Sequence, residues 1–221
     1  MTTSLDSGPV ADTIARLYEN AHAQFANRPP RPEGAPPRRE PSGTAAERAK
    51  AAEDRYMPVS ELTGTLMYSL IRATRPSVIV EFGMSYAIST LHAAAAVRDN
   101  GVGHVYTTEL SEKKLAVAPT TLAEAGVADL VTVLGGDALE TLKSVDGEIG
   151  FVLLDGWKEM YLPILELLEP QLPTGALILA DNTESPEAAS FLDRVRNPEN
   201  GYTSVNLPAK HTDTMELSCR V

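Results

Sequence analysis

The chain contains few aromatic residues, one cysteine and no long apolar run. Phe, Trp and Tyr make up only 5% of its 221 residues, and the single Cys219 cannot form an internal disulfide. No apolar stretch is long enough to cross a membrane, and the first residues lack the basic and apolar regions of a secretion signal. These absences predict a cytoplasmic protein without a disulfide framework or a membrane partner.

Positive charge is also scarce. The sequence has 19 Lys and Arg residues against 30 Asp and Glu residues, which gives a formal net charge of -11. A surface of this sign does not suit the neutralisation of phosphates, so we expect no nucleic-acid partner. The length and the 43% hydrophobic content instead suit one globular domain that acts on small molecules or binds proteins.

Residues 28–50, RPPRPEGAPPRREPSGTAAERAK, differ from the rest in composition and carry a net charge of +3. Pro, Arg, Gly and Ala dominate, and almost nothing there suits a core. We therefore predict an N-terminal helix within residues 1–27, a flexible linker over residues 28–55, and a main domain over residues 56–221. A lid that closes over an acidic site is the alternative interpretation of residues 28–55.

Short apolar runs alternate with amphipathic stretches through the main domain. Continuous apolar runs are typical of strands buried on both faces of a parallel sheet. This order predicts the α/β class, with a doubly wound, mostly parallel seven-stranded sheet of the Rossmann-like type and a C-terminal antiparallel hairpin. Strands are expected at residues 77–82, 104–110, 130–134, 150–155, 175–181, 201–208 and 214–221, and helices at residues 10–26, 89–99, 111–126, 137–144, 158–170 and 189–197.

The first predicted strand ends in VIVEFGMSYAIST, with Glu81 and Gly83 at its carboxyl end. A glycine beyond a buried strand permits a tight turn and the close approach of a ligand. The G-x-G-x-x-G pattern of dinucleotide-binding domains is absent, which disfavours a dehydrogenase. A glycine-poor turn suits a ligand without a pyrophosphate, such as S-adenosylmethionine, and a purely structural turn is the alternative.

Two further acids follow the next strands. Glu109 lies 26 residues beyond Gly83, where nucleotide-binding α/β folds hold the ribose hydroxyls. Its alternative role is to cap the helix at Ser111, although the serine is the better cap. The third loop contains Asp137 and Ala138, which either begin a helix or contact an adenine ring.

The fourth and fifth strands end at Asp155 and at the pair Asp181 and Asn182. Neighbouring parallel strands bring such side chains to one edge of the sheet, where they offer two carboxylates and an amide oxygen. Mg²⁺ prefers a few oxygen ligands of this kind and keeps its other positions for water or substrate. A metal site is thus predicted, and two helix caps are the alternative.

The runs LLDGWKEMY and LILADN, together with YMPVSELTGTLM and IVEFGMSYAIST, carry a family resemblance. They resemble the cation-dependent O-methyltransferases of the catechol and caffeoyl-coenzyme A type, over about residues 56–197. The most specific parts are D-x-W-K-x-x-Y and the later D-N. Members of that family transfer a methyl group from S-adenosylmethionine to a hydroxyl, and their fold is the class I methyltransferase sheet.

The resemblance implies a role for each matching residue. Asp155, Asp181 and Asn182 correspond to the ligands of Mg²⁺ or another divalent cation, Lys158 to the general base, and Trp157 to the indole beside the adenine. Asp155 is thereby both a metal ligand and a catalytic residue. With the strand-end and loop residues above, the expected cofactor-binding set is Met57, Val59, Glu81, Gly83, Ser85, Ser89, Glu109, Asp137, Ala138, Asp155 and Trp157.

The sequence departs from the family pattern at several positions. Ala87 replaces a glycine of the first turn, Ile88 replaces an aromatic residue, and NLPAKHTD has no clear equivalent of the Glu that grips catechols. We therefore expect a sugar, phenol or other natural-product hydroxyl as acceptor, with His211 either contacting it or merely exposed. Family members are commonly dimers, which suggests a homodimer. A catalytically inactive binding module is the main alternative, and a metal-dependent hydrolase is a weaker one.

Overall fold

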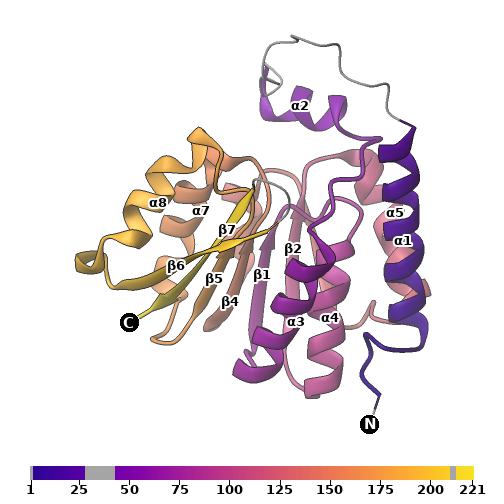
Figure 1. The fold of residues 1–221 in the computed structure, drawn as a ribbon, viewed down its shortest axis with the longest axis horizontal. Helices are drawn as coiled ribbons and strands as arrows, with labels where there is room; N and C mark the ends of the chain where they lie inside the picture. The colour runs from indigo at the N-terminus through magenta and orange to yellow at the C-terminus, as the bar shows by residue number, and fades with distance from the viewer. Residues whose placement is uncertain (1, 28–42, 210–212) are drawn as a thin grey trace.

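The apolar runs of the sequence form one seven-stranded sheet, shown in Figure 1. The computed structural model describes residues 2–27, 43–209 and 213–221. The sheet has the order β3-β2-β1-β4-β5-β7-β6, in which β7 alone runs antiparallel to both of its neighbours. The predicted fold class and terminal hairpin are confirmed. The strands are β1 (Val78–Phe82), β2 (His104–Glu109), β3 (Val131–Gly135), β4 (Ile149–Leu154), β5 (Leu177–Ala180), β6 (Tyr202–Pro208) and β7 (Thr214–Arg220).

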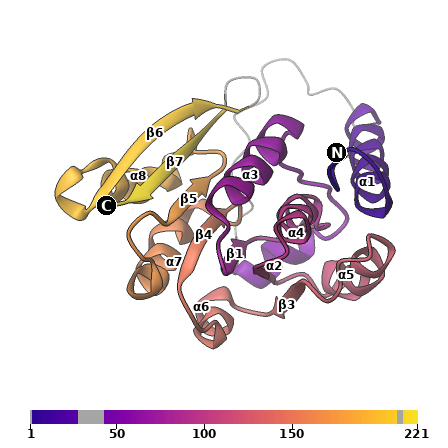
Figure 2. The ribbon, with the colours of Figure 1, turned by 90° about the horizontal axis from the view of Figure 1, so that it is seen from below.

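Helices cover both faces of the sheet, as the view along the strands in Figure 2 shows. Alternate residues of a strand point to opposite faces. On β1, Ile79 therefore joins one hydrophobic cluster while Val78 and Val80 join the other. The first cluster packs under α1 (Pro9–Ala26), α3 (Glu61–Thr74), α4 (Ile88–Asn100) and α5 (Glu112–Glu124), and the second under α6 (Ala138–Thr141), α7 (Tyr161–Leu168) and α8 (Ala189–Arg196).

The helix α4 is buried on nearly all sides, because α1 and α3 cover the face that would otherwise meet solvent. Four consecutive alanines, residues 93–96, allow this close packing. At the contact with α3, a Cβ on Gly64 would lie 2.6 Å from Nε2 of His92, so only glycine fits there. The sequence analysis predicted no helix for the stretch that forms α3.

The structure corrects the predicted linker over residues 43–55. This part holds α2 (Ala45–Ala51), whose first turn has a capping box in which Thr44 and Glu47 exchange hydrogen bonds. Ala49 within this helix and Ala52 at its C-cap are buried. The overall Pro and Arg content concealed this local helix signal, and residues 28–42 lie outside the described part of the chain.

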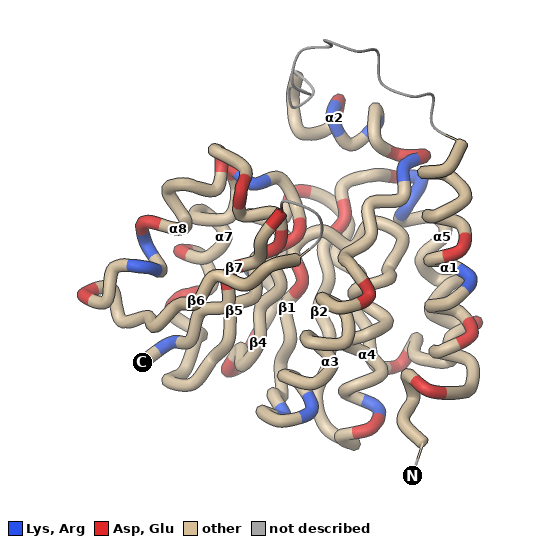
Figure 3. Tube along the Cα trace, in the orientation of Figure 1, with Lys and Arg blue, Asp and Glu red and all other residues tan. Residues whose placement is uncertain are grey.

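The predicted N-terminal helix is present as α1, but it belongs to the main core. Val10, Ile14, Leu17 and Tyr18 of α1 share the hydrophobic cluster of α3 and α4. Among the described helices, none combines the length and the apolar character that a membrane span requires. Figure 3 shows acidic positions distributed over most of the trace, as the net charge of -11 requires.

Candidate functional site

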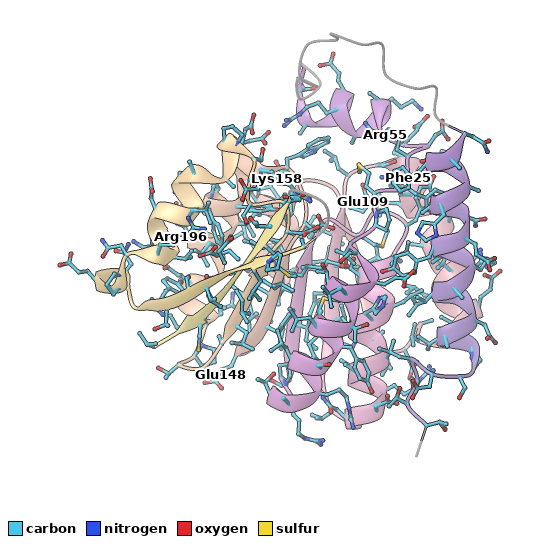
Figure 4. The ribbon with its side chains drawn as sticks, in the orientation of Figure 1. Phe25, Arg55, Glu109, Glu148, Lys158 and Arg196 are labelled. Atoms are coloured by element: carbon cyan, nitrogen blue, oxygen red, sulfur yellow. The ribbon has the colours of Figure 1, made fainter. Side chains whose placement is uncertain are left out.

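A cavity of about 650 Å³ opens at the carboxyl ends of the parallel strands. The loops after the five parallel strands β1 to β5 form its floor, and α2 with the chain through Pro58 covers it. Figure 4 shows Lys158 and Glu109 at this edge of the sheet and Glu148 at the opposite edge. Ligands of open α/β sheets bind at this end. The cavity gathers most of the residues predicted from the sequence: Met57, Gly83, Ser85, Glu109, Asp137, Ala138, Asp155, Trp157, Lys158, Asp181 and Asn182.

Three predicted cofactor residues lie outside this lining. Val59 is buried, and its carbonyl accepts a hydrogen bond from Tyr18. Glu81 is buried among hydroxyl groups, and burial raises the pKa of its carboxyl against the hydrogen bonds that it accepts. Ser89 lines a much smaller adjoining pocket together with Met57. His211 falls outside the described residues.

An amine, a phenol and a carboxylate meet beside β4. The Nζ atom of Lys158 lies 3.6 Å from Oδ1 of Asp155 and donates to the hydroxyl of Tyr161 at 2.8 Å. That hydroxyl donates in turn to the backbone carbonyl of Asp181 at 2.8 Å. Burial, reinforced by Asp155 and Asp181, raises the pKa of Tyr161 well above its usual value. The phenol therefore stays neutral and fixes the position of the Lys158 amine.

The end of β5 supplies a second set of oxygen ligands. Asp181 is buried, and Asn182 follows it in a left-handed conformation with φ 57°. The Asn182 amide nitrogen donates a hydrogen bond to the Asp213 carboxylate. The amide oxygen is therefore the atom of Asn182 that is left to interact with a ligand in the cavity. Within the described chain, no three acidic, histidine or cysteine side chains are grouped as a metal site. The side-chain oxygens that could hold a cation here are those of Asp155, Asp181 and the Asn182 amide.

The turn after β1 is held in an uncommon backbone conformation. Gly83, Ser85 and Ala87 all have positive φ, at 103°, 51° and 67°. A Cβ on Gly83 would lie 2.8 Å from the carbonyl oxygen of Asp155, so glycine is required where the loops after β1 and β4 cross. Backbone strain of this kind is concentrated at ligand sites.

The carboxylate of Glu109 is fixed by backbone groups. Its Oε2 accepts the N–H of Ser85 at 2.8 Å, and its Oε1 accepts the N–H groups of Leu110 and Ser111 at 2.8 and 2.7 Å. These bonds join the turn after β1 to the start of α5. They also hold the acid at the cavity wall in one orientation.

The sequence analysis missed two cationic residues, Arg48 and Lys114. The guanidinium carbon of Arg48, on α2, lies 4.5 Å from the centroid of the Trp157 ring, and Arg48 pairs with Glu159. No local signal predicts contacts between residues so distant in sequence. Lys114 is buried in the cavity wall within the first turn of α5. Lys114 could have been noticed in the sequence, because a lysine in the first turn of a predicted helix is electrostatically unfavourable.

The chain is similar to known methyltransferases. Residues 80–183 match the protein family described as methyltransferase domain. Catechol O-methyltransferase from Sus scrofa is 34% identical over 152 residues, which cover 65% of this chain and 80% of the porcine protein. Catechol O-methyltransferase from Bos taurus is 34% identical over 148 residues, which cover 63% of this chain and 53% of the bovine protein. The chain thus spans about half the length of the bovine relative.

The fold recurs in a solved structure of low sequence identity. The O-methyltransferase from Bacillus cereus, determined in complex with SAH, has a TM-score of 0.67 and 19% identity to this chain. The match covers 94% of this chain and 100% of the bacterial one. A match of this extent supports the same overall fold for nearly the whole chain.

Proposed function

The chain belongs to the family of cation-dependent, S-adenosylmethionine-dependent O-methyltransferases, and we propose that it methylates a hydroxyl of a small molecule with the help of Mg²⁺. The family resemblance expected from the sequence is confirmed. The observation that carries the proposal is that one cavity gathers Asp155, Lys158, Asp181 and Asn182 beside Glu109. The residues that we assign to the acceptor and those that we assign to the cofactor thus line the same cavity.

We assign the cofactor to the side of the cavity that runs from Asp155 to Glu109. Glu109 accepts a ribose hydroxyl, and Trp157 offers its ring to the adenine beside Asp137. The turn at Gly83 faces the methionine end. The backbone bonds that fix Glu109 orient its carboxylate before the cofactor binds, which lowers the entropy lost on binding.

The oxygen ligands at the ends of β4 and β5 fit a small, hard cation. Asp155, Asp181 and Asn182 would hold Mg²⁺, which favours a few protein oxygens and retains positions for other ligands. The ion, when bound, would lower the pKa of a coordinated hydroxyl and orient it for methyl transfer. Asp213 supports this set by holding the Asn182 amide.

Lys158 is the residue that we assign to the proton. Its Nζ lies within the cavity wall, 3.6 Å from Asp155, and the Tyr161 hydroxyl keeps it there. In its neutral form, an amine so placed takes the proton of an acceptor hydroxyl held beside Asp155 and becomes an ammonium. α2 lines the same cavity and contacts the neighbouring Trp157 through Arg48.

Methyl transfer to a panel of a catechol, a phenol and a sugar tests the proposal. With Mg²⁺ and S-adenosylmethionine, we expect a product heavier by one methyl group, and we expect a chelator to abolish it. Calorimetric binding of the cofactor should persist with the chelator. Transfer unaffected by the chelator would refute the role of the cation, and absence of cofactor binding would refute the proposed function.

Substitution of Lys158 tests the assignment of the base. Lys158→Met should abolish methyl transfer and leave cofactor binding intact. Lys143→Met is the matched control, because Lys143 is exposed and, among the described residues, pairs with Glu140 on the same turn. A Lys158→Met variant as active as the wild type would refute this assignment and indicate that another group accepts the proton.

A homodimer and a cytoplasmic location stay predictions, and light scattering tests the first.

A further inference from the structure

Lys114 is buried in the wall of the cavity next to the acid assigned to the ribose. Its exposed fraction is 2%, and it lies in the first turn of α5, whose N-cap is Ser111. Burial lowers the pKa of its amine, while the carboxylate of Glu109 acts in the opposite direction. Neither the burial nor the helix N-terminus favours a lysine. A structural role alone therefore does not explain it.

The amine of Lys114 has N–H donors that make no hydrogen bond to the described residues. An ammonium group carries three N–H donors. In the described part of the chain, Nζ makes one hydrogen bond, to Oγ of Ser85 at 3.1 Å, and forms no ion pair. It also lies 5.5 Å from the centroid of the Tyr86 ring. The remaining donors belong to a side chain that lines the cavity, so they are available to an oxygen of a bound ligand.

The carboxylate of Glu109, in contrast, has few acceptor positions left for a ligand. A carboxylate has about four lone-pair positions, and backbone N–H groups already occupy three of them on Glu109. The free position is on Oε2, which among the described residues accepts the N–H of Ser85 alone. Glu109 can therefore accept one hydroxyl proton but not both protons of a ribose diol. The second hydroxyl needs a donor to its oxygen.

We propose that Lys114 binds the ribose of S-adenosylmethionine by donating a hydrogen bond to the hydroxyl oxygen that Glu109 leaves without a partner. The acid and the amine then form a matched pair, one accepting a proton and the other donating one. Ser85 links the two, because its N–H donates to Glu109 and its hydroxyl accepts from Lys114. This inference rests on the proposed function.

Calorimetric binding of S-adenosylhomocysteine to the wild type and to Lys114→Met tests the inference. Loss of a charge-assisted hydrogen bond should weaken binding about tenfold or more. Lys113→Met is the matched control, since Lys113 is its neighbour on α5 but is half exposed and pairs with Asp54. Its affinity should stay within about twofold of the wild type.

Ligands that lack the 2′- or the 3′-hydroxyl separate direct contact from an indirect effect on the turn. If Lys114 contacts a hydroxyl, removal of that hydroxyl should weaken binding to the wild type more than to Lys114→Met, because the contact is already lost. Equal losses in both proteins, or equal affinities of Lys114→Met and the wild type, would overturn the inference while leaving the proposed function intact. A wild type that binds no S-adenosylhomocysteine would overturn both.

Folding of the variant is checked by thermal unfolding without ligand. Removal of a buried charge should leave the melting temperature of Lys114→Met equal to or above that of the wild type. If the variant is instead unfolded, Lys114→Gln keeps a neutral donor and should show an intermediate affinity. An affinity of Lys114→Gln equal to that of the wild type on every ligand would then refute a charge-assisted contact.

Discussion

Replacement of Arg48 by alanine should detach α2 from the loop that follows β4. Arg48 stacks on Trp157 and pairs with Glu159, while other contacts of the covering segment lie farther along the chain. α2 has only seven residues, and a helix of this length is marginal in water without tertiary contacts. The protection of its backbone amides therefore depends on how firmly it docks.

The size of the effect follows from two contacts. A cation over an indole contributes about 0.5–2 kcal/mol, depending on its desolvation, and the Arg48 side chain is 13% exposed. The pair with the more exposed Glu159 adds about 0.2–1 kcal/mol. Nε of Arg48 is buried and meets no acceptor among the described residues, which offsets part of the gain. A net loss of about 1–2 kcal/mol corresponds to roughly 5–30-fold faster opening.

Hydrogen exchange followed by mass spectrometry measures this opening. Amides of α2 should exchange roughly 5–30-fold faster in Arg48→Ala than in the wild type, and those of α4 should not change. Arg16→Ala is the matched control, because Arg16 makes an exposed pair with Glu124 away from α2. Unchanged exchange in α2, or the same acceleration in the control, would refute the reasoning.

Three further variants test other contacts of the site and the fold. Gly156→Ala places a Cβ 2.3 Å from Cε1 of Phe82, so overpacking should cost about 1–3 kcal/mol and lower the melting temperature by roughly 2–12 °C, measured by calorimetry. Tyr161→Phe removes the hydroxyl that holds Lys158 and should lower kcat roughly tenfold with unchanged cofactor affinity; an unchanged kcat would argue against positioning. The pKa of Glu216 is lowered, because its hydrogen bonds outweigh the opposing effect of burial. Its folded pKa lies below its unfolded value, so its contribution is complete above about pH 4.5 and declines as the pH falls through the folded value. Denaturation midpoints of the wild type and Glu216→Gln should therefore converge as the pH falls below about 4.5, and a difference that stays constant would contradict this sign.

The floor of the cavity could be predicted because it depends on short-range patterns. Continuous apolar runs identify strands buried on both faces, and parallel strands bring their carboxyl ends to one edge. Asp155, Asp181 and Glu109 each stand at the end of such a run. Their convergence followed from the strand pattern alone, before any contact between them was known.

The cover of the cavity could not be predicted in the same way. Arg48 meets Glu159 across 111 positions of sequence, and no periodicity encodes that contact. The α2 segment carries a capping signature at Thr44 and Glu47, but the neighbouring prolines and arginines dominate its composition. A local capping signal is therefore more informative here than the average composition of the surrounding segment.

Lys158 and Lys114 share an unfavourable electrostatic position that can be recognised in the sequence. Both lysines stand at the start of a helical turn or helix, where the free N–H groups disfavour a cation. The family motif identified Lys158 in the sequence, whereas no motif marks Lys114, to which the same physical reasoning applies. Both lysines line the same cavity, beside the strand-ending acids Asp155 and Glu109, which is why we assign a ligand contact to each of them. Lys113 and Lys114 are neighbours in the first turn of α5, but only Lys114 is buried in the cavity wall. If burial at the site matters and charge near the helix start does not, cofactor affinity should fall in Lys114→Met and stay unchanged in Lys113→Met.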